Sequence, residues 1–316
     1  MMKKVRSGQV EKMLRRGLRH DRRAISQLMS MAENDPHSRL EILAQLYWRG
    51  KESDVIGITG PPGCGKSTLI AQLAKGYRAA GHSVGIVAVD PSSQITGGAL
   101  LGDRIRMGEL AADPKIFIRS MATRGQFGGV ARATEDAVRI LAATSTNYVI
   151  VETAGAGQSD VDVKAIADTT IVVTSPGLGD EIQALKAGIM EIGDIFVVNK
   201  ADKEGADQTV QEIYSMVSMG EPVDGWRPRV IKTVATTGEG TIALAEAISQ
   251  HVEHIRNSTR SSSSAKREVL SATRRYFEDV KLQEIETTAK FRKLVAQVEA
   301  RRMDPYTAAR ELVEGR

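Results

Sequence analysis

The chain has 316 residues, of which 41% are hydrophobic, 26% charged and 4% aromatic, and its formal net charge at pH 7 is +4. A chain of this length and composition can bury a substantial apolar core. It has no apolar run near the roughly 20 residues that span a bilayer, and no apolar segment typical of a secretory signal. We therefore expect a cytoplasmic protein without a membrane contact.

Both ends of the chain are basic. Residues 1–25 carry nine Lys and Arg against two acids, and residues 256–316 carry fourteen against nine. Basic segments can bind nucleic acid or an anionic membrane. Here acids are interleaved with the bases, and there are few aromatic residues on which bases could stack. We expect solvated helix faces and no nucleic-acid partner.

The first part of the chain is predicted to be helical. Apolar residues recur at helical spacing over residues 7–49, so residues 1–53 are predicted to form a helical N-terminal segment.

Seven apolar runs then alternate with helical segments. The runs cover residues 55–59, 84–89, 116–120, 148–152, 170–175, 195–199 and 230–235. They are continuously apolar, which is typical of strands with helices on both faces of the sheet. The pattern predicts a doubly wound α/β domain with a mainly parallel sheet over residues 54–255.

The stretch over residues 256–267 is polar and rich in serine, so we expect a flexible connection. Helical periodicity resumes after it and predicts two or three helices. These helices are too small to enclose a core of their own. We therefore predict that residues 256–316 form a linker and a helical arm that joins two copies in a homodimer.

Residues 60–67, GPPGCGKS, match the P-loop pattern between a predicted strand and a predicted helix. Backbone N–H groups of such a loop wrap a phosphate, Lys66 reaches the β- and γ-phosphates, and the Ser67 hydroxyl ligates Mg²⁺. Cys64 occupies a variable position and is interpreted as structural, not as a nucleophile. The predicted nucleotide-binding residues here are Gly60, Pro61, Pro62, Gly63, Cys64, Gly65, Lys66, Ser67 and Thr68.

The motif NKAD follows the sixth apolar run. The Asp202 carboxylate can accept hydrogen bonds from N1–H and the amino group of guanine, a donor pair that adenine lacks. Together with Asn199 and Lys200 it predicts GTP and GDP as ligands. At the end of the last run, Val234, Ala235 and Thr236 stand where GTPases usually carry a loop against the base, with Val234 in place of the usual serine.

The fourth run ends at Glu152, an acid at a strand end that can reach Mg²⁺ directly or through water. Asp90 and Asp103 are further candidate Mg²⁺ groups, although Asp103 can equally be an ordinary acid at a helix N-terminus. Lys66, Glu152, Asp103 and Gln158 are the predicted catalytic residues. Ala156 stands where Ras-like proteins carry a water-positioning glutamine, so we expect slow hydrolysis that a partner accelerates.

Six segments together resemble one family. They read GPPGCGKST, VDPSSQITGGALLGDRIRM, RSMATRGQFGGVARAT, VETAGAGQSD, GLGDEIQALKAG and VNKAD. In order and spacing they are similar to the MeaB/ArgK-type, MMAA-like P-loop GTPases, which are chaperones of adenosylcobalamin-dependent acyl-CoA mutases. The resemblance covers about residues 10–255 and, more loosely, the C-terminal arm.

The resemblance implies a homodimeric GTPase that gates cofactor loading and protects or reactivates its mutase. The mutase, rather than this chain, would hold adenosylcobalamin. Departures at Gln94, Ile95, Ala154 and Ala156 leave the mutase open among methylmalonyl-CoA, isobutyryl-CoA and 2-hydroxyisobutyryl-CoA types. In the family the GLGDEIQALKAG segment is an additional switch loop, which implies that Asp180, Gln183 and Lys186 couple hydrolysis to the partner.

Two other functions share parts of this sequence pattern. A P-loop kinase or ATPase, the label given to some ArgK-like transport proteins, would need an acceptor pocket with a base and would not need NKAD. A metal-insertion GTPase of the hydrogenase or urease type would need a metal-binding tract, whereas the chain has one Cys and five scattered His. His251 and His254, one helical turn apart, are interpreted as a solvated helix face.

Overall fold

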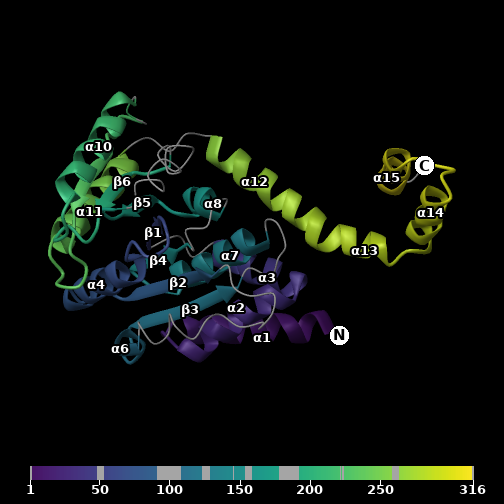
Figure 1. Ribbon diagram of the computed structural model, residues 1–316. Coiled ribbons are helices and arrows are strands. Elements are labelled where there is room, and N and C mark those ends of the chain that lie inside the picture. The colour runs from purple at the N-terminus through teal and green to yellow at the C-terminus, as the bar shows by residue number, and fades with distance from the viewer. Residues whose placement is uncertain are drawn as a thin grey trace.

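The computed structural model describes residues 2–47, 53–90, 108–122, 129–144, 146–153, 159–177, 192–220, 222, 224–257 and 263–314. In these ranges helices cover both faces of a parallel sheet, and a helical arm extends away from it (Figure 1).

The sheet has seven strands within the described ranges. They are β1 (Asp54–Thr59), β2 (Val84–Asp90), β3 (Ile116–Ala122), β4 (Tyr148–Glu152), β5 (Thr169–Thr174), β6 (Ile195–Val198) and β7 (Arg229–Lys232). Their order is β3-β2-β4-β1-β5-β6-β7, and all neighbouring pairs are parallel. The seven predicted strands and the doubly wound α/β fold are confirmed.

Helices connect the strands and form both ends of the chain. They are α1 (Met2–Gly17), α2 (Arg22–Asn34), α3 (Pro36–Tyr47), α4 (Lys66–Ala79), α6 (Gly108–Ala111), α7 (Gly129–Ala143), α8 (Ser159–Ile166), α10 (Ala206–Met219), α11 (Thr241–Asn257), α12 (Ser263–Tyr276), α13 (Leu282–Glu286), α14 (Ala289–Glu299) and α15 (Pro305–Glu314). A π-helical turn, η1 (Phe277–Lys281), joins α12 to α13.

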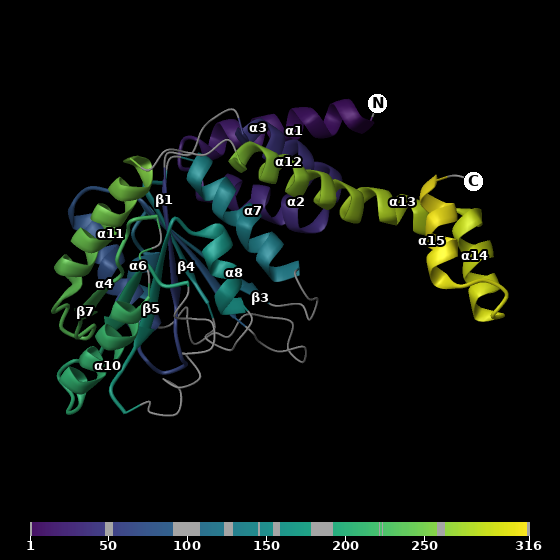
Figure 2. The same ribbon diagram turned by 90° about the horizontal axis from the view of Figure 1, so that it is seen from above.

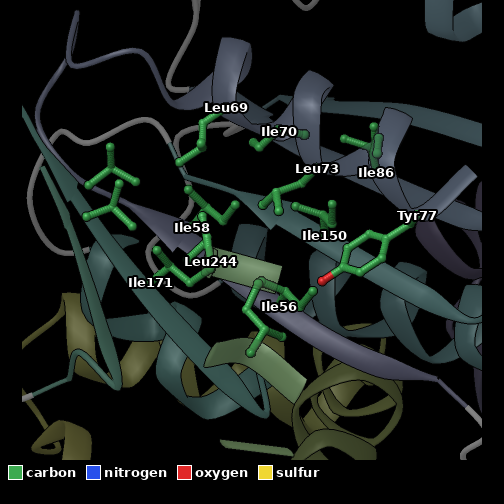
Figure 3. Packing of buried hydrophobic residues seen from close by; sticks show 14 of the residues in the cluster. Ile56, Ile58, Leu69, Ile70, Leu73, Tyr77, Ile86, Ile150, Ile171 and Leu244 are labelled. Carbon is green, nitrogen blue, oxygen red and sulfur yellow. The ribbon is translucent and has the colours of Figure 1, made fainter. Parts of the chain in front are cut away.

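Helices α4 and α11 cover one face of the sheet. Their apolar side chains, such as Leu69, Leu73 and Leu244, pack against Ile56 and Ile150 of the central strands (Figure 3). A fully buried branched side chain of this kind contributes about 1.5–3 kcal/mol through its removal from water. This packing fixes the helix that follows the P-loop against the strand that precedes it.

The N-terminal helices share the core of the opposite face. Leu14, Leu28 and Ile42 come from α1, α2 and α3, and they lie in one buried cluster with Val87 and Val149 of the sheet. Helices α7 and α8 belong to the same cluster, while α10 covers a smaller one near β6. The N-terminal helices are therefore packed as part of the sheet's covering layer.

The arm begins with α12 and carries α14 and α15 at its far end (Figure 2). The helices reach further into the serine-rich stretch than the sequence predicts, because α11 continues to Asn257 and α12 already begins at Ser263. Serine, lysine and arginine tolerate helical backbone, so polar composition alone does not end a helix there.

His251 is not on a solvated helix face. Its side chain is buried, Nδ1 lies 2.9 Å from Thr169 Oγ1, and Nε2 lies 3.6 Å from Asp194 Oδ1. The ring of Trp226 covers it at a centroid distance of 4.7 Å. Burial lowers the pKa of His251 below its ordinary value of 6.5, although the Asp194 carboxylate opposes the shift.

We predict that the protein loses stability in acid partly through His251. Because its pKa is lowered in the folded state, the unfolded chain takes up the proton first as the pH falls through about 6.5. The stability contributed by neutral His251 is complete above that pH and is lost below it. Chemical unfolding between pH 7 and about pH 5 should therefore show a smaller loss of stability for His251→Gln than for wild type. Equal losses in the two proteins would contradict this.

We also predict that Leu28→Ala lowers the free energy of unfolding of the whole protein by about 2–5 kcal/mol, because it opens a cavity in the core shared with the sheet. The exposed neighbour offers a control, since Gln27→Ala should change stability by no more than about 0.5 kcal/mol. Denaturant unfolding followed by circular dichroism measures both. A separate early transition for Leu28→Ala would mean that the N-terminal helices unfold on their own.

Candidate nucleotide site

The predicted site residues meet at one edge of the sheet. Since all the strands are parallel, their carboxyl ends lie at the same edge, where α/β proteins commonly bind ligands. The P-loop follows β1, Glu152 ends β4, Asn199 follows β6, and Val234 lies just after β7. These residues, far apart in the sequence, therefore face a common region.

The P-loop backbone requires glycine at several positions. Gly60, Gly63 and Gly65 have φ angles of 140°, 77° and 97°, which residues with a side chain rarely adopt. A Cβ atom on Gly60 would lie 1.9 Å from the carbonyl oxygen of Val173. Gly65 leads directly into α4, so backbone N–H groups at the start of this helix face the loop and can bind a phosphate.

Lys66 lies inside this loop. Its side chain is buried, and Nζ donates hydrogen bonds to the carbonyl oxygens of Gly60 at 2.7 Å and Pro61 at 3.0 Å. Both acceptors are neutral. Phosphate oxygens are anionic and bind an ammonium group more strongly, so a nucleotide phosphate can replace these carbonyls as the partner of Lys66.

Ser67 and Glu152 place a hydroxyl and a carboxylate side by side near the loop. The Ser67 hydroxyl donates a 2.6 Å hydrogen bond to Glu152 Oε1, and Glu152 is only 7% exposed. A hydroxyl and a carboxylate at this spacing fit a hard cation such as Mg²⁺, which prefers oxygen ligands. Mg²⁺ held there would neutralise charge on the phosphates.

Asn199 bonds two separate loops of the site. Its side chain is 2% exposed, and Nδ2 donates to the carbonyl oxygen of Cys64 at 2.8 Å. Oδ1 accepts hydrogen bonds from Thr233 Oγ1 at 3.1 Å and from the Ala235 N–H at 3.0 Å. One amide thus connects the phosphate loop to the loop after β7.

Lys200 and Asp202 form the turn after Asn199. Lys200 has a positive φ of 56°, and its Nζ donates a 2.6 Å hydrogen bond to the carbonyl oxygen of Gly63. The Ala201 N–H donates to the Thr233 carbonyl oxygen at 3.0 Å, which fixes the turn beside β7. Asp202 remains exposed at the end of this turn, where its carboxylate can accept hydrogen bonds from guanine.

The loop after β7 is held by hydrogen bonds between its own backbone groups. Val234 and Ala235 are buried, and the Val234 N–H donates to the Glu239 carbonyl oxygen at 3.0 Å. Thr236 is exposed. Of the three residues predicted to lie against the base, Thr236 is therefore the one whose side chain faces solvent.

Cys64 is completely buried, and burial raises the pKa of its thiol above the ordinary value. A neutral, inaccessible thiol is a poor nucleophile. Its geometry agrees with a structural role, in which the backbone carbonyl of Cys64 serves as the acceptor for Asn199.

Several predicted residues lie outside the described part of the chain. These are Asp103, Gln158, Asp180, Gln183 and Lys186. Asp90 ends β2 as predicted, at the same edge of the sheet, but its side chain is not described.

Two contacts near the site were not found from the sequence. The Thr153 hydroxyl lies 2.9 Å from the Thr59 hydroxyl, and this hydrogen bond links the residue after Glu152 to the residue before the P-loop. Arg119 Nη2 donates hydrogen bonds to both carboxylate oxygens of Glu33 at 2.9 Å. Local sequence patterns cannot indicate either contact, because the two residues of each pair lie more than 80 positions apart in the chain.

The fold and the site together define a P-loop nucleotide-binding protein with a guanine-type base loop. The comparisons agree with this class: residues 23–290 match the family model described as methylmalonyl Co-A mutase-associated GTPase MeaB. The chain belongs to this family and is a GTPase that binds GTP and GDP.

Relatives and solved structures extend the comparison. A protein of Pyrococcus abyssi named as a GTPase is 43% identical over 95% of this chain and 94% of its own length. The mouse protein named methylmalonic aciduria type A homolog, mitochondrial, is 39% identical over 58% of this chain and 46% of its own length. A crystal structure described as a LAO/AO transport system kinase has the same fold, with a TM-score of 0.69, 24% identity and 97% of both chains covered.

Among the helices in the described ranges, none has both the length and the apolar character that crossing a membrane requires.

We predict that Gly65→Ala destabilises the nucleotide-free protein more than Gly63→Ala. Both substitutions force a side chain into a positive φ. Only the Cβ at Gly65 meets a neighbour, at 2.3 Å from Asn199 Nδ2, whereas the Cβ at Gly63 meets nothing within 4 Å. The extra loss should be about 1–3 kcal/mol, because the buried hydrogen bonds of Asn199 must break. Denaturant unfolding of the two variants measures it, and equal stabilities would show that Asn199 moves without cost.

Proposed function

We propose that this GTPase is a chaperone of an adenosylcobalamin-dependent acyl-CoA mutase, and that it gates cofactor loading and protects or reactivates that enzyme. The family match over residues 23–290 carries the proposal, because it spans both the nucleotide-binding domain and the first part of the arm. The names of the family and of the mouse relative point to methylmalonyl-CoA metabolism. An isobutyryl-CoA or 2-hydroxyisobutyryl-CoA mutase remains an alternative partner.

The site supports a role as a switch. Lys66, Ser67 and Glu152 would hold the phosphates and Mg²⁺, and Asn199, Lys200 and Asp202 would hold guanine. Because Asn199 bonds both the P-loop and the loop after β7, phosphate and base binding depend on one arrangement. Loss of the γ-phosphate at such a site can release loops that a partner reads.

The cofactor is assigned to the partner. In the described ranges no three His, Cys, Asp or Glu side chains gather in a metal-binding cluster. His251 and His254, the two histidines that lie closest together in the sequence, already contact other groups of the chain. His251 Nδ1 lies at hydrogen-bond distance from Thr169 Oγ1, and His254 Nε2 from the carbonyl oxygen of Asp224. In this proposal adenosylcobalamin is held by the mutase, and this chain controls access to it.

The arm supports a homodimer. It exposes the apolar side chains of Val269, Leu270, Tyr276, Phe277 and Leu282 along α12, η1 and α13. Exposed apolar residues on one helical segment commonly mark a protein interface, and a second copy of the arm offers a matching apolar surface.

The proposal is tested by single-turnover GTP hydrolysis with and without each of the three purified mutases. One mutase should accelerate hydrolysis at least about tenfold, as partners do for other GTPases with slow intrinsic rates. If none accelerates hydrolysis or co-elutes with the GTP-bound protein, the chaperone function is wrong while GTPase activity remains.

We predict that Lys186→Ala abolishes the acceleration by the mutase and leaves the Kd for GTP unchanged, because Lys186 would contact the partner and not the nucleotide. Lys203→Ala removes an exposed charge beside the guanine turn and is the matched control, which should keep full acceleration. Isothermal titration with GTP accompanies the hydrolysis assay. A loss of GTP affinity in Lys186→Ala would assign this residue to the nucleotide site or to the fold.

A further inference from the structure

A group of charged side chains lies between the arm and the nucleotide-binding domain. Arg275 of α12 pairs with Glu135 of α7, and Asp279 of η1 pairs with Arg39 of α3. Asp136 of α7 lies between the two arginines, 3.4 Å from Arg39 Nε and 3.6 Å from Arg275 Nη1. Positive and negative groups alternate through all five side chains.

These charges are largely removed from solvent. The side chains are 5% exposed for Asp136, 11% for Arg39, 15% for Asp279, 16% for Arg275 and 22% for Glu135. Surface ion pairs contribute little to the stability of a folded protein. Breaking a buried pair is strongly destabilising, because it leaves a buried charge without a partner. Such a contact therefore favours one arrangement of its partners over others.

The charges of the group are matched when a sixth residue is included. Arg139, one turn along α7, pairs with Glu135 at 2.9 Å and brings the group to three cations and three anions. The nucleotide-binding domain alone, without the arm, would leave Asp136 and Arg39 paired with each other and Glu135 with Arg139. The arm adds one cation and one anion at the positions that complete the set.

The helix of the arm changes its winding at this contact. Asp279 lies in the π-helical turn η1, where the Leu282 N–H donates to the carbonyl oxygen of Phe277, five residues earlier. Such turns are rare and often occur at functional sites. Val280 in the same turn is 3% exposed, so the wider turn combines one buried apolar side chain with the ion pair of Asp279 and Arg39.

We propose that Arg39, Glu135 and Asp136 form an arm-docking surface, and that its partner is the segment of the arm that carries Arg275 and Asp279. The surface fixes the direction in which the arm leaves the domain, and so determines where the exposed apolar residues of the arm are presented. Arg275, near the C-terminal end of α12, is where this helix contacts α7, and the arm extends away from the domain (Figures 1 and 2). This proposal does not depend on the identity of the mutase.

Pulsed electron spin resonance between nitroxide labels at Glu253→Cys and Glu299→Cys tests the proposal. Both positions are exposed, one on α11 and one on α14, and the native Cys64 is buried. Excess unlabelled protein removes distances between copies. The labelled protein with no other substitution should give one narrow distance distribution. Adding Arg275→Glu should replace this single maximum by a broad distribution.

Two further variants make the test specific. Arg274→Glu changes the exposed neighbouring arginine and should leave the distribution narrow. Combining Arg275→Glu with Glu135→Arg restores opposite charges between these two positions and should recover part of the narrow maximum. The recovery is incomplete because the new Glu side chain faces Asp136 and the new Arg side chain faces Arg139. GTP binding, measured alongside, should be unchanged in all three variants.

Hydrogen exchange gives a second measurement. Amides of η1 should exchange at least about tenfold faster in Arg275→Glu than in Arg274→Glu, because a buried charge loses its partner. The arm-docking surface is wrong if Arg275→Glu and Arg274→Glu give the same distance distribution and the same exchange. It is equally wrong if the combined Arg275→Glu and Glu135→Arg variant recovers none of the narrow distance maximum.

Discussion

The nucleotide site depends on the buried side chain of Asn199, whose two amide atoms bond the P-loop and the loop after β7 at the same time. An amide that is 2% exposed must satisfy both its donor and its acceptor, because an unpaired buried polar group costs about 1–3 kcal/mol. The two loops are therefore held in one relative position. The glycine at position 65 belongs to the same constraint, since any side chain there would occupy the space of Asn199.

The parallel sheet makes this arrangement possible. Strands β1, β4, β6 and β7 end at one edge, and the packing of α4 and α11 on one face holds the helix after the P-loop in place. The Thr59–Thr153 hydrogen bond adds a lateral link between the strand ends that carry the P-loop and Glu152. The Glu152 carboxylate proposed to ligate Mg²⁺ is thus positioned by the end of β4, and the Ser67 hydroxyl by the start of α4.

The same helical layer that covers the other face of the sheet also carries the contact for the arm. Helix α7 packs its apolar residues into the core and presents Glu135 and Asp136 to α12, while α3 contributes Arg39. The candidate nucleotide site and the contact with the arm therefore belong to the same sheet-and-helix domain.

Local patterns were sufficient to predict the seven strands, the P-loop and the guanine motif, because each is encoded within about ten consecutive residues. Tertiary structure alone decided the contacts between distant segments. The bond between Asn199 and Cys64 spans 135 residues, and the pair of Arg39 and Asp279 spans 240. His251 shows the same limit, since its helix has an ordinary amphipathic sequence and only the approach of Asp194 and Trp226 buries its ring. Hydrophobic periodicity determines which face of an element is buried, but the order in which strands and helices pack determines which polar groups meet there.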